Sequence, residues 1–392
     1  MTLFEQMDLG DIVTFQRGFD ITKAEQVPGA IPIISSSGIT SFHNESKVTA
    51  PGIIIGRKGT LGTVHYTNDN YWPHDTTLWV KDFKGNFPKF IYYFLKTLHL
   101  ENFDTGSSNP TLNRNHIHKI RVYFPKSIEI QRKIAAMLAA YDELIEVNRQ
   151  RISLLEQAAE ELYREWFVRM RFPGYEHTPI EHGIPQGWEI VKVEQAFDYT
   201  AGGTPSKNIE RFWKNGTINW YTPSDITASQ GIFLFESNDK CTEEGLDSSS
   251  SKIFPAYSIM MTSRATIGAI GINTTEACTN QGFITCIPNK TYPLSFLYHW
   301  LKTNKTYFES LCGGATFLEL TKGVFKNINI LTPPIEIMEI FERKTRPLID
   351  SIENCQKQNQ KLQTARDQLL PKLMAGTLDL SDLDIHYPPS MS

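Results

Sequence analysis

Two stretches of the chain decide the fold: LLEQAAEELYREWF at residues 154–167 and KLQTARDQLLPKLM at residues 361–374. Both are dominated by Leu, Ala, Glu, Gln, Lys and Arg, the residues with the highest helix propensity. They lie about 207 residues apart in a chain of 392 residues, a period far longer than that of a solenoid or propeller repeat. The sequence therefore predicts two long helices that occupy equivalent places in a duplicated chain.

The duplication extends upstream of both helices. Ile120 and Pro125 of the first half return as Ile328 and Pro333 of the second. A second run is repeated at nearly the same spacing, with Lys58, Thr60, Leu61 and Gly62 returning as Arg264, Thr266, Ile267 and Gly268. A whole unit, one globular region followed by one long helix, has been duplicated, which suggests one task performed at two places.

The long helices carry a seam of apolar residues at alternating spacings of four and three, which is typical of coiled coils. Each predicted helix covers about 40 residues, or roughly 60 Å, and so overshoots its own domain. We expect the two helices to pair with each other, antiparallel, with a pseudo-two-fold axis across the pair. The predicted seam consists of Ile134, Leu138, Tyr141, Ile145, Asn148, Ile152, Leu155, Leu162, Leu348, Ile352, Asn359, Leu362 and Leu369.

Two asparagines interrupt this seam, and a proline lies near the end of the second helix. Asn148 and Asn359 either form a buried pair that fixes the register of the helices or face solvent, and the pattern leaves both readings open. Pro371 is expected to kink or end the second helix because proline lacks a backbone donor.

The globular regions show short apolar bursts bounded by Gly, Pro, Asn or Ser, as strands do. Residues 31–34, 52–55 and 78–80 are three such bursts, and residues 87–98 and 293–302 predict a buried helix in each half. Both regions are thus expected to share a mixed α/β fold. The predicted segments are a first globular domain at 1–126, a helix at 127–170, a linker at 171–186, a second globular domain at 187–334, a second helix at 335–376 and a tail at 377–392.

Composition and charge narrow the possible classes of protein. The net charge is −4 and only residues 1–126 carry a slight excess of basic side chains, so a lone chain would bind DNA weakly without basic partners. No apolar run reaches membrane-spanning length, and the N-terminal residues do not resemble a signal peptide. The five cysteines form no CxxC pair, which favours a reducing, cytoplasmic location without a zinc site.

No segment has the spacing of a catalytic or cofactor-binding motif. The chain lacks a phosphate loop, a glycine-rich S-adenosylmethionine loop and the Asn-Pro-Pro-aromatic motif of amino-methyltransferases. Asn109-Pro110 begins like the last of these but lacks the second proline. We therefore expect no catalytic residues and no metal ligands in this chain, and a role in recognition.

Several phrases resemble the specificity subunits of Type I restriction-modification systems. The most characteristic of them is RDQLLPKLMAGTLDL at residues 366–380. It is preceded, in the expected order, by GWEIVKVEQAFDYTAGGTPSK (187–207), INWYTPSDI (218–226) and ACTNQGF (277–283). The resemblance covers nearly the whole chain. The first half departs from it, because GFDITKA (18–24) replaces the GGTPS phrase and HDTTLW (74–79) replaces TNQGF.

This resemblance implies a division of labour. Each recognition domain would read one half of a bipartite sequence in double-stranded DNA, and the helices would set the gap and dock two methyltransferase subunits. Those subunits would hold S-adenosylmethionine and methylate adenine N6 after flipping it from the duplex. Motor-nuclease subunits, joined through the methyltransferase complex, would use ATP and Mg for restriction.

Candidate DNA contacts are polar or basic residues in loops, the types that read base edges and hold phosphates. Gly202 and Gly203 are expected to let the backbone approach a phosphate closely, and Arg264 with its counterpart Lys58 forms the strongest pair. The full set is Arg57, Lys58, Ser107, Ser108, Asn109, Thr111 and Arg114 in the first half and Gly202, Gly203, Thr204, Ser206, Lys207, Tyr221, Ser224, Asp225, Arg264, Thr266, Asn280, Gln281, Thr316 and Lys322 in the second.

Two other classes of function compete with this one. An enzyme with a dispersed active site, such as a nuclease or a stand-alone methyltransferase, would show activity as a purified chain. An adaptor that binds protein or RNA through its duplicated domains would not respond to DNA half-sites.

Overall fold

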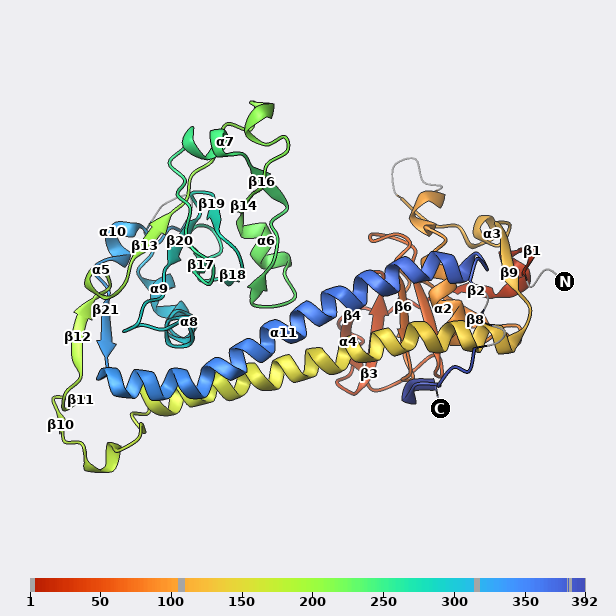
Figure 1. Ribbon diagram of the computed structural model, residues 1–392. Coiled ribbons are helices and arrows are strands. Elements are labelled where there is room, and N and C mark those ends of the chain that lie inside the picture. Colours follow the sequence, from red (N-terminus) through yellow and green to blue (C-terminus); the bar gives the residue numbers. More distant parts are fainter. Residues whose placement is uncertain (1–3, 105–109, 314–317, 379, 381–382, 392) are drawn as a thin grey trace. The chain divides into compact units, whose positions relative to one another are not determined.

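The computed structural model describes residues 4–104, 110–313, 318–378, 380 and 383–391. These residues form two compact units, Met1–Val147 with Asn359–Ser392, and Asn148–Gln358. Each unit contains one globular domain and one half of each long helix (Figure 1).

The globular domain of the first unit is built on three small sheets. The largest has the order β2-β8-β5-β6 with antiparallel neighbours, the second has the order β4-β3-β7 with β3 and β7 parallel, and β1 pairs with β9. The strands are β1 (Phe4–Asp8), β2 (Thr14–Arg17), β3 (Ile31–Ser35), β4 (Gly38–His43), β5 (Gly52–Gly56), β6 (Val64–Thr67), β7 (Trp72–Pro73), β8 (Thr77–Asp82) and β9 (Arg121–Pro125).

The second unit repeats this topology. Its large sheet has the order β13-β20-β17-β18-β15, its three-stranded sheet β16-β14-β19 again has one parallel pair, and β12 pairs with β21. Among these, β15 extends the large sheet beyond the four-stranded pattern of the first unit. The strands are β12 (Glu189–Lys192), β13 (Tyr199–Ala201), β14 (Ile218–Tyr221), β15 (Phe233–Leu234), β16 (Asp239–Cys241), β17 (Ile259–Thr262), β18 (Ile270–Asn273), β19 (Ala277–Thr279), β20 (Phe283–Cys286) and β21 (Asn329–Thr332), preceded by the short hairpin β10 (Ile180–Glu181) and β11 (Ile184–Pro185).

The three predicted strands of the first domain and the predicted buried helix of each domain are confirmed. Ile53, Ile54 and Ile55 of β5 are all fully buried, as expected for a strand covered on both faces. The helix α2 (Pro88–Lys96) packs on the first large sheet, and α8 (Leu294–Thr303) is its counterpart in the second unit. The shorter helices are α1 (Leu9–Ile12), α3 (Arg114–Ile117), α5 (Val193–Ala196), α6 (Pro223–Ala228), α7 (Glu243–Asp247), α9 (Lys305–Ser310) and α10 (Lys322–Phe325), with single turns η1 (Leu100–Phe103), η3 (Tyr175–His177), η4 (Glu210–Phe212) and η5 (Pro389–Met391).

Two long helices, α4 (Ile128–Tyr163) and α11 (Ile335–Met374), dominate the chain, and α4 continues into one π-helical turn, η2 (Arg164–Val168). Within each unit the two helix segments run antiparallel, as Figure 1 shows. In the first unit Asp142 of α4 accepts a hydrogen bond from the Tyr93 hydroxyl of α2 (2.5 Å). It also forms an ion pair with Arg366 of α11 (2.5 Å). The helix pair is therefore tied to the globular domain as well as to itself.

Every residue of the predicted seam is buried or half-buried. Asn148 and Asn359 are only 7% and 8% exposed, so the alternative that they face solvent does not hold. Asn148 donates to the side chain of Gln358, and Asn359 donates to the backbone carbonyl of Ile145, both at 3.3 Å. Each asparagine thus donates a hydrogen bond from its side-chain amide to the opposite helix, and buried polar groups generally need such a partner.

Pro371 does not end its helix. Helix α11 continues to Met374, and the Pro371 carbonyl still accepts a bond from the Ala375 amide at 2.9 Å. The chain turns away at Gly376, whose φ of +68° is readily adopted by glycine. Only three residues of the helix follow this proline, so any local distortion that it causes affects little of α11.

All five cysteines are free thiols. Among the described residues, no helix combines the length and apolar character that crossing a bilayer requires.

Candidate nucleic-acid interface

The first unit gathers polar segments around the turn that joins β7 to β8. The amide of Gly18 donates to the Thr77 carbonyl at 3.0 Å, and those of Arg57 and Lys58 donate to the Thr76 carbonyl at 2.8 and 3.0 Å. The Leu112 amide in turn donates to the Arg57 carbonyl at 3.1 Å. We call the result the first polar edge, defined as Arg17, Arg57, Lys58, Asp75, Thr111, Asn113 and Arg114.

The second unit builds the same edge around the turn that joins β19 to β20. The Gly203 amide donates to Thr279 (2.9 Å), the Ser263 amide to Gly282 (2.8 Å), and the Leu320 amide to Ser263 (2.9 Å). These bonds bring together four segments that are distant in sequence. The second polar edge is defined as Thr204, Ser224, Arg264, Gln281 and Glu319.

A cavity of about 360 Å³ opens at the first polar edge. Its polar lining comes from three arginines, one threonine and one asparagine, with Leu78 and Leu112 supplying the apolar part. Partial burial lowers the pKa of Arg57 from its ordinary value, and the nearby positive charge of Arg17 lowers it further. Positive charge is therefore concentrated here, and an anion would relieve the repulsion.

The structure places most of the predicted contact residues at the surface. Arg57, Thr111, Gly202 and Asn280 are half-buried. The exposed ones are Lys58, Arg114, Thr204, Ser206, Lys207, Ser224, Arg264, Thr266, Gln281 and Lys322. Ser107, Ser108, Asn109 and Thr316 lie outside the described residues.

Gly202 and Gly203 have a structural reason to be glycine. A Cβ on Gly202 would lie 2.0 Å from the Thr279 carbonyl oxygen, and one on Gly203 would lie 2.5 Å from the Ser251 amide. A Cβ on Gly18 of the first domain would likewise lie 2.0 Å from the His74 carbonyl oxygen. The close backbone approach expected here is thus made by the protein's own chain, and the Gly203 amide is already used.

Tyr221 and Asp225 are also structural in this fold. Tyr221 is fully buried and donates its hydroxyl to the Leu234 carbonyl at 3.3 Å. The Asp225 carboxylate, 7% exposed, accepts from the amides of Thr222 (2.7 Å) and Asn238 (2.9 Å). Both side chains are therefore buried and bonded within the domain, whereas the INWYTPSDI phrase led us to expect accessible contact residues.

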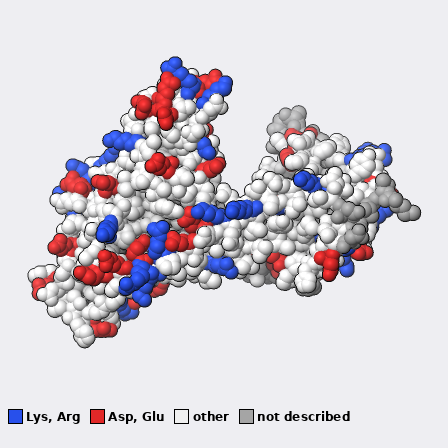
Figure 2. All heavy atoms as spheres, in the orientation of Figure 1, with Lys and Arg blue, Asp and Glu red and all other residues white. Residues whose placement is uncertain are grey.

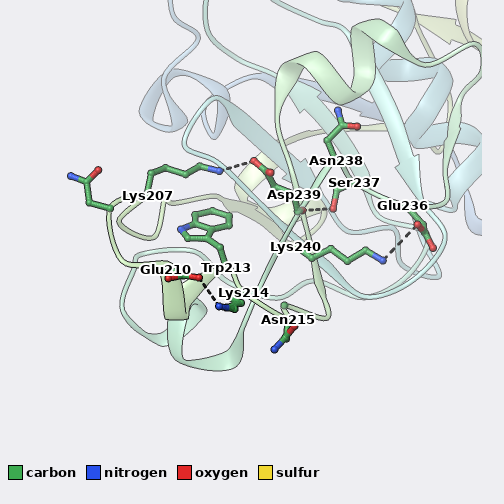
Figure 3. Close-up of a pocket in the computed structure, with 12 residues that line it drawn as sticks. Lys207, Glu210, Trp213, Lys214, Asn215, Glu236, Ser237, Asn238, Asp239 and Lys240 are labelled. Carbon is green, nitrogen blue, oxygen red and sulfur yellow. Dashed lines mark hydrogen bonds and ion pairs between the residues drawn. The ribbon is translucent and has the colours of Figure 1, made fainter.

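Lys207 lies in a second cavity, of about 710 Å³, shown in Figure 3. Its ammonium group pairs with Asp239 at 2.6 Å and sits 3.6 Å from the ring centre of Trp213. Lys214 and Lys240, which also line the cavity, pair with Glu210 and Glu236. Its charges are balanced, so this cavity offers less attraction to an anion than the first polar edge.

The equivalent pair Lys58 and Arg264 differs in its surroundings. Each residue forms a backbone bridge, Lys58 to Thr111 and Arg264 to Glu319. Arg264 also donates from Nε to the Glu319 carboxylate at 2.8 Å, whereas Lys58 forms no ion pair with the described residues. The second domain thus places an acidic partner where the first domain has a threonine.

Sequence reasoning missed Arg17, Asp75, Asn113 and Glu319. Arg17 ends a strand and Asp75 belongs to the HDTTLW phrase, which departs from the family pattern. Their pairing at 2.9 Å depends on the register of β2 against β8, which no local pattern reveals.

Asp20, His74 and Asp75 are the candidate metal ligands in the described part of the chain, with ligand atoms within 4.8 Å of one another. However, Asp75 already pairs with Arg17. A guanidinium at this distance opposes a bound cation, so we assign no metal to this cluster.

Surface charge agrees with the mild acidity of the second unit. On the face seen in Figure 2, its basic and acidic side chains are intermixed. This face therefore offers no continuous basic patch, so long-range attraction of a polyanion to it would be weak.

Comparison with known proteins assigns the chain to a protein family. Residues 1–157 and 185–364 match the Type I restriction modification DNA specificity domain. The chain belongs to this family. The two matched segments each contain one polar edge, so the family assignment and the duplication support each other.

Individual relatives agree with the assignment. The specificity subunit of the MjaIX Type I restriction enzyme from Methanocaldococcus jannaschii is 34% identical over 182 residues, which is 46% of this chain and 42% of that protein. The HindI specificity subunit from Haemophilus influenzae is 25% identical over 331 residues, 69% of this chain and 71% of its own length. The chain thus spans less than half the length of the first relative and about seven tenths of the second.

A solved structure confirms the fold. The S subunit of the Type I restriction-modification system from M. genitalium superposes with a TM-score of 0.62 at 16% identity, covering 94% of this chain and 96% of that one.

Proposed function

We propose that this chain is a DNA-specificity subunit in which each polar edge reads one half of a bipartite sequence in double-stranded DNA. The observation that carries the proposal is the repetition of one edge, built from equivalent turns in the two family-matched segments. Two copies of one reader, differing in side chains such as Thr111 and Glu319, suit two half-sites of different sequence.

The long helices would set the gap between the half-sites and dock the methyltransferase subunits. Support for docking comes from apolar side chains that the helices leave exposed. In the first unit Leu144 and Val147 of α4 are 54% and 49% exposed, and in the second unit Leu154 of the same helix is 66% exposed. Leu144 and Val147 are three residues apart and so lie on the same face of α4, and neighbouring exposed apolar side chains are typical of protein interfaces.

Chemistry would then reside in the partners. Two methyltransferase subunits would hold S-adenosylmethionine and methylate adenine N6, and motor-nuclease subunits would use ATP and Mg. This chain would contribute recognition and spacing, with no catalytic group of its own.

The test is to co-express the chain with its cognate methyltransferase subunit in a methylation-free host and map modified adenine across the genome. We expect a split motif with a fixed gap. No modified motif from an assembled complex would contradict the proposal and favour the adaptor alternative. Modification by the purified chain alone would show that it is itself an enzyme.

A further inference from the structure

The cavity at the first polar edge is unusual in its charge. Arg17, Arg57 and Arg114 line it and no carboxylate does. By contrast, the cavity around Lys207 is lined by three lysines and three acidic residues. Guanidinium groups have donors only, so the cavity is built to receive a group that is both negatively charged and rich in acceptors.

One carboxylate reaches this cluster from outside the cavity. Asp75 Oδ2 lies 2.9 Å from Arg17 Nη2, and the Asp75 backbone carbonyl accepts from Arg57 Nη1 at 3.3 Å. The other carboxylate oxygen, Oδ1, lies 3.2 Å from His74 Nδ1. Asp75 therefore neutralises Arg17 in the free protein, while Arg114 forms no ion pair with the described residues.

We propose that this cavity binds one phosphodiester of the DNA backbone, and that Arg17 exchanges the Asp75 carboxylate for that phosphate when DNA binds. The proposal rests on the function proposed above. Arginine matches the geometry of phosphate oxygens and pairs with them more strongly than with neutral acceptors. Base edges present donors as well as acceptors, and a cavity with three donor-only groups suits them less well.

Exposure of the groups makes the exchange feasible. The Arg17 side chain is 54% exposed and that of Asp75 is 20% exposed. An ion pair so open to solvent contributes little to stability, so breaking it costs little. In the second domain Arg264, the counterpart of Lys58, pairs with Glu319 instead of being left without an acidic partner among the described residues.

The first test measures DNA affinity against salt for the full chain in complex with its methyltransferase subunit. The probes are a labelled duplex that carries the methylated motif and one in which the first half-site is scrambled. Because a phosphate contact releases counterions, Arg17→Ala and Arg114→Ala should each lower the slope of log K against log salt by about 1. Both probes should lose affinity by a similar factor, since phosphate contacts carry no sequence information.

Arg121→Ala is the matched control. Arg121 belongs to the same domain, is 64% exposed and pairs with Asp8 at 3.7 Å, but does not line the cavity. If the wild-type complex binds neither probe, the proposed function fails. If it binds DNA but the cavity variants match Arg121→Ala in slope and affinity, only the phosphate site is overturned.

The second test addresses the exchange itself. Asp75→Asn should tighten binding of both probes in the wild-type background, because Arg17 no longer has to leave a carboxylate. The gain should largely disappear when Arg17→Ala is present, which a double-mutant cycle measures. An equal gain in both backgrounds would mean that Asp75 merely repels DNA and would overturn the exchange. Thermal unfolding of each variant checks that the fold is retained.

Discussion

At the scale of single residues, Tyr221 separates a structural role from a recognition role. Its hydroxyl is buried and bonded to the Leu234 carbonyl. Tyr221→Phe should therefore lower the free energy of unfolding by about 1 kcal/mol, the net value of a buried hydrogen bond, and leave DNA affinity unchanged. Tyr123→Phe, at a tyrosine that is 64% exposed, should change neither. Weaker DNA binding by the stable Tyr221 variant would restore the contact expected from sequence.

Arg264 is the residue for which the sequence makes the strongest case. Arg264→Ala should weaken DNA binding by about tenfold, on the order of 1–3 kcal/mol for a lost contact. Glu319→Gln should not weaken it, since this change only removes the carboxylate that pairs with Arg264 in the free protein. Anisotropy titrations of both variants provide the measurement. Equal weakening by the two changes would show that the ion pair acts by holding the loop.

His299 gives the fold a dependence on pH. It is 1% exposed and its ring contacts the Ser295 carbonyl through Nδ1 at 2.7 Å, and burial lowers its pKa to about 4 from 6.5. The unfolded chain therefore binds a proton that the folded protein excludes. The free energy of unfolding should fall as pH is lowered from about 6.5 to about 4, by roughly 3 kcal/mol from this group.

Denaturant unfolding at several pH values tests this. His299→Gln cannot titrate and should flatten the profile in that window relative to wild type. His182→Gln, at an exposed histidine, should follow the wild-type profile. A His299→Gln profile parallel to wild type would contradict the assignment.

At the scale of elements, the helices are what the sequence predicts best. The spacing of apolar positions gave both helices and the seam, because helical periodicity is local. Pro371 was expected to kink or end α11, but the helix continues past it to Met374, within two residues of the predicted boundary at 376. The Arg17–Asp75 pair could not be predicted, because it depends on which strands become neighbours. The tight packing at Gly202 has the same origin, because its GGTPS phrase was equally compatible with close approach of the backbone to a DNA phosphate.

The helices also lead to a prediction about spacing. Seven residues inserted into each helix, in register with the seam, add about 10 Å at 1.5 Å per residue. The gap between half-sites should then grow by about three base pairs at 3.4 Å each, with both half-sites unchanged. The same insertion in the linker at residues 171–186 serves as the control and should leave the gap as it was. A gap that ignores the helix insertion would show that the helices do not set it.

At the scale of the whole molecule, the central claim is that two equivalent domains read two half-sites independently. Duplicated topology and repeated polar edges support it, and the different residues at matched positions, such as Thr111 and Glu319, explain how the halves can differ. The division into two equivalent domains was predictable from the repeat alone. Which candidate side chains are exposed was not, because loop geometry sets exposure.

The most direct measurement exchanges residues 187–334 for the matching segment of a relative and maps methylated adenine for both complexes. The account predicts that one half of the split motif changes, while the other half and the gap stay the same. A change in both halves, or a continuous motif in either complex, would contradict it.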